Sequence, residues 1–190
     1  MTANSPAFDW FAFALEILAV FLGVLGAFEL DNLRDRRAEN KERKRILKLI
    51  HRELKANHDI IDAANLTKAG QVLNTRTMRN IWEGIASKLS VLSNDDLLGE
   101  VTLTYFDIAN ADRNFDMYDE YARRYQQAVT SEKAAMKPEL ERECAHFKRY
   151  ATKIVLPQIV KVLKLIDDEL AGKLPKTEHV PPRNGGKRVP

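Results

Sequence analysis

Few residues of this chain stand at spacings that support catalysis or metal binding. Residues 143–146 read Glu-Cys-Ala-His, a Glu-x-x-His motif that supplies part of the ligand set in di-iron helix bundles. The complete site needs that motif from two helices, and the sequence holds no second copy. His51 and His58 are seven residues apart, too far along one helix to share a metal. With phosphate loops, nucleophile elbows and zinc spacings also missing from the sequence, we expect no catalytic residue, no cofactor, no metal and no enzyme activity.

One ionisable residue, Glu16, stands inside an apolar run that covers residues 10–30. A carboxyl group within a membrane-spanning helix is costly and by default marks an interaction or functional site. Three interpretations remain open: the side chain is protonated or reaches the nearer headgroups, it hydrogen-bonds a neighbouring helix, or it lines a proton or ion pathway. Ala19, Gly23 and Ala27 follow Glu16 at spacings of three and four, so they share its helix face. Together they form a small-residue ladder that permits close packing against another helix.

The apolar run itself predicts one transmembrane helix over residues 10–30. A bilayer core about 30 Å thick needs roughly 20 mostly apolar residues, and this run meets that length with Glu16 and Glu29 as its charges. Trp10 lies at its start, where aromatic rings favour the headgroup layer. A cleaved signal peptide is not expected, because no basic residue precedes the run and no small-residue cleavage pattern follows it. Residues 1–9 are then a short external tail.

A basic stalk follows the predicted span and sets its orientation. Residues 34–48 hold eight Lys or Arg against three Asp or Glu, while residues 1–9 hold no Lys or Arg. Because positive residues beside a span stay in the cytoplasm, we expect a single-pass plasma-membrane protein with its N-terminus outside and its long domain in the cytoplasm. A solvated helix face and a lipid-binding stalk explain the charge pattern equally well. The candidate ligands of anionic lipid headgroups are Arg34, Arg36, Arg37, Lys41, Arg43, Lys44 and Arg45.

Downstream of the stalk the pattern is helical, and we predict an all-α fold with no sheet. Residues 31–66 should continue the span as one stalk and heptad helix, and residues 67–172 should form a helical bundle with a helix over 71–89. In that bundle we expect a break at 110–114. The last long helix should begin at Lys137-Pro138, kink at Pro157 and end at Gly172. Residues 173–190 should form a disordered tail. A heptad seam packs either within the chain or between chains, and its residues are Leu47, Ile50, Leu54, Asn57, Ile61 and Ala64.

The run from Glu16 to Asp35 resembles the opening of a set of uncharacterised bacterial proteins catalogued as domain of unknown function 6090. Proteins of that set begin with a glutamate, a small-residue span, an Asn or Asp at its end, a tryptophan and a basic helix. The resemblance covers roughly residues 10–60, and Leu33 stands where the tryptophan is usual. It implies the single-span topology, and the family has no established activity that could be carried over to this chain.

These features favour a membrane-anchored helical protein that acts by contact, as a scaffold, an assembly component or a sensor. The alternative is a subunit of a small oligomeric channel or proton pathway in which Glu16 lines a shared axis. The expected partners are the lipid bilayer and, through the span, a second copy or another membrane protein. We expect no nucleic-acid partner, because the basic charge is concentrated in the stalk rather than dispersed over the chain.

Overall fold

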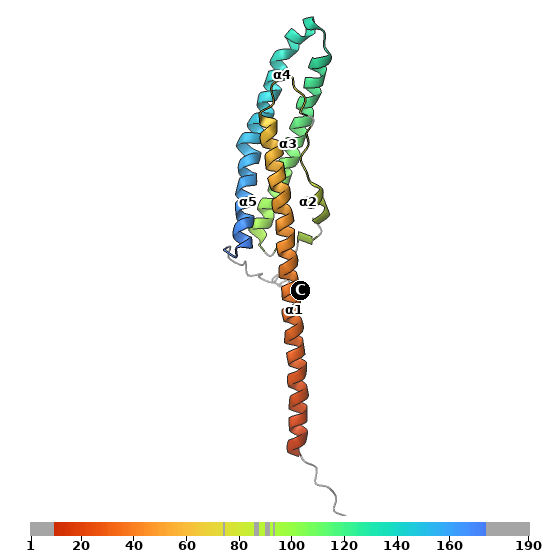
Figure 1. The fold of residues 1–190 in the computed structure, drawn as a ribbon, viewed down its shortest axis with the longest axis vertical. Coiled ribbons are helices and arrows are strands. Elements are labelled where there is room, and N and C mark those ends of the chain that lie inside the picture. Colours follow the sequence, from red (N-terminus) through yellow and green to blue (C-terminus); the bar gives the residue numbers. More distant parts are fainter. Residues whose placement is uncertain (1–9, 74, 86–87, 90–91, 93, 174–190) are drawn as a thin grey trace, which may run out of the picture. The chain divides into compact units, whose positions relative to one another are not determined.

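The computed structural model describes residues 10–73, 75–85, 88–89, 92 and 94–173, without the side chains of residues 10–14, 16 and 17. Its helices are α1 (Trp10–Asn65), α2 (Asn80–Ile85), α3 (Asp95–Gln127), α4 (Thr130–Tyr150), the π-helix η2 (Ala151–Val155) and α5 (Leu156–Leu170) (Figure 1). No strand occurs within these described residues, which confirms the all-α prediction. The predicted tails at 1–9 and beyond Lys173 lie outside the described residues.

The chain divides into two units, residues 1–42 and residues 43–190. The first unit consists, in its described part, of the N-terminal portion of α1. The second unit, called here the helical domain, contains the rest of α1 and all the other helices (Figure 1). As predicted, the helix that begins at Trp10 runs through the basic stalk into the heptad segment without a break.

The heptad seam of α1 packs within the chain. All six of its residues are buried in the helical domain, and Ile50, Leu54 and Ile61 have no exposed surface. Their spacing of three and four puts them on one helix face, so a single chain provides the apolar surroundings that this face requires. This resolves the open alternative in favour of packing inside the bundle.

The central helix of the domain is α3, which forms one continuous helix. Asn94 caps it by accepting a hydrogen bond from the backbone N–H of Leu97 at 3.0 Å, as the Ser-Asn-Asp-Asp sequence predicts. The predicted break at 110–114 is wrong, because the buried face continues through Ala111 and Phe115. Buried positions recur along α3 at the heptad spacing of a helical bundle: Leu97, Val101, Thr104, Ile108, Ala111, Phe115, Tyr118 and Ala122.

The last helices form a second arm beside α3. The prediction that this arm begins at Lys137-Pro138 is wrong, because α4 begins at Thr130 and holds Pro138 in its interior. The turn before Pro157 departs from α-helical geometry, while the predicted kink itself stays a prediction. The preceding turn is π-helical, and the backbone N–H of Leu156 reaches the carbonyl of Ala151. Gly172 ends α5 as predicted, with a φ of 70° and a backbone N–H that donates to the carbonyl of Glu169 at 3.0 Å.

The predicted helix over residues 71–89 is wrong. The described residues between Gln71 and Arg79 are not helical, and only Asn80–Ile85 form a helix there, the short α2. Gly70 turns the chain with a φ of 90°, a conformation that side chains with a Cβ rarely adopt. We call residues 67–79 the strap. Its path is determined by polar side chains of α1 and α3.

Candidate functional site

The predicted transmembrane interaction residues lie in the part of α1 that belongs to the first unit. Ala19, Gly23 and Ala27 are exposed, and a Cβ added to Gly23 would meet no described heavy atom within 4 Å. The side chain of Glu16 lies outside the described residues, so its three interpretations stay open. The small-residue ladder therefore remains a prediction, with an open face on which a second helix has room to pack.

Large apolar side chains cover most of the circumference of this part of α1. Those that the structure describes are between 47% and 69% exposed, and they lie on every side except the face of the small-residue ladder, Ala19, Gly23 and Ala27. A helix with such a surface needs an apolar environment that the described residues of the chain do not provide. The exposed members between residues 15 and 33 are Leu15, Leu18, Val20, Phe21, Leu22, Val24, Leu25, Phe28, Leu30 and Leu33.

The predicted headgroup ligands divide into two groups. Arg34, Arg36, Arg37 and Lys41 belong to the first unit and are exposed, as are Lys44 and Arg45 at the start of the helical domain. Arg43 differs, because its guanidinium forms an ion pair with Glu169 of α5 and is partly buried. That burial lowers the pKa of the Arg43 side chain. The Arg43–Glu169 pair joins α1 to the C-terminal helix, so this arginine contributes to the domain's structure.

Within the domain, the most developed polar site is the row of side chains that holds the strap. The carboxylate of Asp119 accepts a hydrogen bond from the backbone N–H of Leu73 at 2.7 Å. Two turns earlier on α3, Asp112 accepts from the backbone N–H of Thr77 at 3.1 Å and from its hydroxyl at 2.6 Å. The backbone N–H of Thr77 is thus bonded to Asp112 instead of to a carbonyl within a helix over 71–89, and the backbone N–H of Leu73 is bonded to Asp119.

The same face of α3 carries two further hydrogen-bonding residues. Gln126 donates from its side-chain amide to the carbonyl of Gly70 at 2.9 Å, whereas Tyr105, ten residues after the first residue of α3, bonds to Glu53 rather than to the strap. Tyr105, Asp112, Asp119 and Gln126 are spaced seven residues apart, so they share one face beside the heptad core. We call these four residues the strap row. Sequence reasoning missed this row, although its signal is readable: hydrogen-bonding residues recur every seven positions, each one residue after a position of the inward face. Of those inward positions, Thr104, Ala111 and Tyr118 are buried and Tyr125 is partly buried.

Helix α1 binds the strap from the other side. Asn57 donates to the carbonyl of Met78 at 2.7 Å and accepts from its backbone N–H at 2.6 Å, so one amide satisfies both main-chain groups. One turn earlier, the buried carboxylate of Glu53 accepts from the backbone N–H groups of Ile81 at 2.8 Å and Trp82 at 3.0 Å. Glu53 therefore satisfies free N–H groups at the beginning of α2.

The hydroxyl of Tyr105 completes the Glu53 site. It donates to the Glu53 carboxylate at 2.6 Å, and its ring stacks on Trp82 with centroids 4.5 Å apart and planes 14° apart. Burial raises the pKa of the Tyr105 phenol, and the hydrogen bond to Glu53 raises it further. The phenol consequently stays a hydrogen-bond donor over the whole physiological range. Glu53 thus accepts three hydrogen bonds, two from the main chain of α2 and one from Tyr105 of α3, and so joins α1 to both elements.

Asp119 is the buried acid with a remaining free oxygen. Its Oδ2 is buried without a hydrogen bond, while Arg76 Nη1 lies 3.5 Å away and Arg123 Nη2 lies 3.9 Å away. The two guanidinium groups compensate the charge of this oxygen at a longer distance. The attraction between Arg76 of the strap and Asp119 of α3 helps to hold the strap against α3.

The remaining sequence candidates take structural roles. Cys144 is buried, and burial raises the pKa of its thiol, which lowers the thiolate fraction at neutral pH. His51 lies 3.4 Å from Asp167 and His58 lies 3.5 Å from Asp59, so the two histidines face different acids. Among the described residues, no three His, Cys, Asp or Glu side chains are grouped so that they could hold a metal ion.

A shallow groove of about 370 Å3 lies where the end of α1 meets the strap. Its lining is mostly apolar, with polar groups from three residues at the rim, and no catalytic arrangement of side chains is present among them. The lining residues are Asp59, Ile60, Ala63, Ala64, Thr67, Leu73 and Thr75.

Comparison with known proteins gives no relative. The chain matches no family model, no curated protein and no solved structure. None of the helices in the described part of the chain has an apolar stretch long enough to cross a membrane.

Proposed function

We propose that the chain is a single-pass membrane protein whose helical domain acts by contact with other proteins. Three roles fit this description: a scaffold, an assembly component and a sensor. In this proposal residues 10–30 span the plasma membrane, the N-terminus lies outside and the helical domain lies in the cytoplasm. The resemblance of residues 10–60 to the bacterial proteins of domain of unknown function 6090 favours the same topology.

This proposal rests on the large apolar side chains that are exposed over most of the circumference of the N-terminal part of α1. Burial of a Leu or Phe side chain is worth about 1.5–3 kcal/mol, so leaving this many in water would be strongly unfavourable. Such a surface is typical of a lipid-facing helix or of an interface. The sequence run extends from residue 10 to residue 30, and the side chains described within it are Leu15 and residues 18–30.

The internal order of the helical domain supports action by contact. Its buried carboxylates accept hydrogen bonds from the main chain, and its groove carries no set of reactive side chains. Exposed apolar residues also occur on α3, where Leu103 is 49% and Phe106 is 61% exposed. A domain whose described buried carboxylates bond to the main chain and whose surface carries exposed apolar residues fits a binding module better than an enzyme.

The test is membrane fractionation of the full chain with a matched pair of variants. Leu22→Arg combined with Leu25→Arg puts two charges into the apolar run, each unfavourable by about 2.5–3.5 kcal/mol at a helix centre. The control, Leu103→Arg with Phe106→Arg, makes the same change at exposed apolar sites of the helical domain. Unmodified chain and control should stay with membranes after alkaline carbonate washing, and the first variant should be lost from them.

Orientation is tested with reporters fused after residue 190. A reporter that works only in the cytoplasm should be active there, and a reporter that works only outside should be inactive. Release of the unmodified chain by carbonate would refute the anchor. Activity of the outside reporter would refute the orientation and leave the anchor standing.

A further inference from the structure

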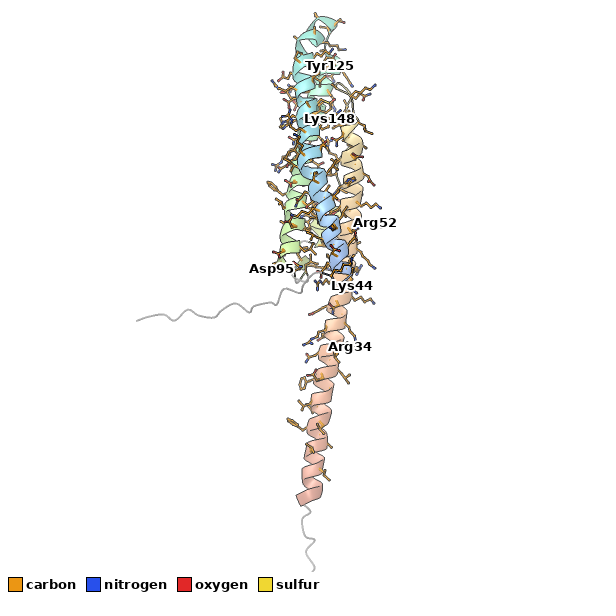
Figure 2. All side chains as sticks on the ribbon, turned by 90° about the vertical axis from the view of Figure 1, so that its left-hand side faces the viewer. Arg34, Lys44, Arg52, Asp95, Tyr125 and Lys148 are labelled. Carbon is orange, nitrogen blue, oxygen red and sulfur yellow. The ribbon has the colours of Figure 1, made fainter. Side chains whose placement is uncertain are left out.

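Four cationic residues form an unbroken row on the outer face of α1 within the helical domain. They recur at spacings of four, four and three, so at 100° per residue they share one face. That face lies opposite the buried seam of Ile50, Leu54 and Ile61, and all four side chains are exposed. We call this set the outer basic row: Lys44, Lys48, Arg52 and Lys55 (Lys44 and Arg52 are labelled in Figure 2).

Within the part of the chain that the structure describes, the side chains of the row form no ion pair. Glu53 lies between two of its members, but its carboxylate is buried and binds Ile81, Trp82 and Tyr105. The nearby acids Asp59 and Asp167 face histidines instead. None of the four row residues makes an ion pair with any described residue, so their mutual repulsion is left uncompensated.

Elsewhere the domain pairs its interhelical cations with acids on a neighbouring helix. Lys161 of α5 lies 2.7 Å from Glu100 of α3, and Arg43 of α1 pairs with Glu169 of α5. The outer basic row is equivalent to one half of such a helix–helix charge contact. Opposite charges on a facing helix would complete it.

We propose that the outer basic row is a docking surface for an acidic helix of another protein. The row is about 16 Å long at 1.5 Å per residue, and its charges are about 6 Å apart. Acidic residues at a spacing of four on a partner helix repeat at the same interval. This inference rests on the proposed contact function of the helical domain and names the chemistry of its partner.

The surroundings of the row favour a protein helix over a membrane surface. A helix that lies in the membrane interface inserts large apolar side chains beside its cations. Residues 34–65 of α1 are all described, and none of their large apolar side chains has half of its surface exposed. Contact with such a partner through charges alone makes the complex sensitive to salt.

The test uses the full chain in nanodiscs of neutral phosphatidylcholine and a fluorescent alanine-rich peptide with four Glu at spacings of four. Peptide binding is followed by anisotropy, and a peptide with Gln in place of Glu is the ligand control. Replacing all four row residues by Gln should weaken binding about tenfold or more, since each exposed ion pair contributes about two- to fivefold at most. Raising the salt should weaken binding of the unmodified chain.

A matched protein control removes the same charge from scattered exposed sites of the helical domain. It replaces four cations that pair with no described acid, namely Arg113, Arg149, Lys153 and Lys164, each by Gln. This control should bind the acidic peptide like the unmodified chain. Equal weakening in both variants would show a net-charge effect and would overturn the docking surface.

A charge exchange makes the test independent of folding losses. Replacing the four row residues by Glu should abolish binding of the Glu peptide and create binding of a Lys peptide of the same spacing, a gain that a misfolded chain would not show. A further arm offers the row nanodiscs that contain anionic phosphatidylglycerol. If the row binds these nanodiscs and does not bind the peptide, the surface is a membrane contact and the proposal fails. Absence of peptide binding by a chain that still fractionates with membranes overturns the row and leaves the anchor intact.

Discussion

Substitution of Glu53 by alanine should cause the largest loss of stability that a single polar change produces in the helical domain. The carboxylate accepts hydrogen bonds from Ile81, Trp82 and Tyr105 at 2.6–3.0 Å, and the residue is 2% exposed. Its removal leaves three donors in a poorly solvated site. A buried donor without a partner costs about 1–3 kcal/mol, so we expect a loss of at least about 3 kcal/mol, with α2 released from α1.

The assay is chemical and thermal unfolding of the full chain in mild detergent, followed by tryptophan fluorescence. Trp82 reports directly on the site because it stacks on Tyr105, and Trp10 is replaced by Phe in all samples to remove its signal. For a domain of this size, about 1 kcal/mol shifts the melting temperature by about 2–4 °C, so Glu53→Ala should lower it by at least about 6 °C.

Tyr105→Phe is the matched control for this prediction. It removes one of the three donors and keeps the ring that stacks on Trp82, so it should destabilise the domain by about 1 kcal/mol. In the double variant the two losses should not add, because both residues share one hydrogen bond. A loss below about 1 kcal/mol for Glu53→Ala, or full additivity with Tyr105→Phe, would refute the structural role given to this carboxylate.

Two further predictions concern the bundle and the apolar run. Burial raises the pKa of Tyr118 to about 12, above its ordinary 10.0, so its contribution to stability is complete below pH 10 and declines as the pH rises toward 12. Tyr118→Phe should therefore flatten the alkaline loss of stability measured by unfolding between pH 9 and 12, and an unchanged slope would contradict this. Gly23→Leu should lower the oligomeric state in detergent if the small-residue ladder packs helix on helix, whereas Val24→Leu, on another face, should not. Identical sedimentation of the two variants would remove the ladder as an interface.

The sequence predicted those parts of the fold that depend on neighbours in the chain. The seam of α1, the cap at Asn94 and the end at Gly172 were predictable, because a three-four apolar spacing, an Asx cap and a C-terminal glycine act over a few residues. The interior position of Pro138 was not, since proline is favoured at a helix start and α4 nonetheless begins eight residues earlier.

The strap shows what only the tertiary structure decided. Residues 71–79 have a composition that suits a helix, but their main-chain donors bond to side chains far away in sequence: Leu73 to Asp119, and Thr77 to Asp112. A local pattern does not contain the position of acids 35 to 46 residues away. The polar repeat of Tyr105, Asp112, Asp119 and Gln126 was present in the sequence all along. Its role depends on α3 being one continuous helix, which places all four side chains on one face. There Asp112, Asp119 and Gln126 bond to the strap, and Tyr105 bonds to Glu53.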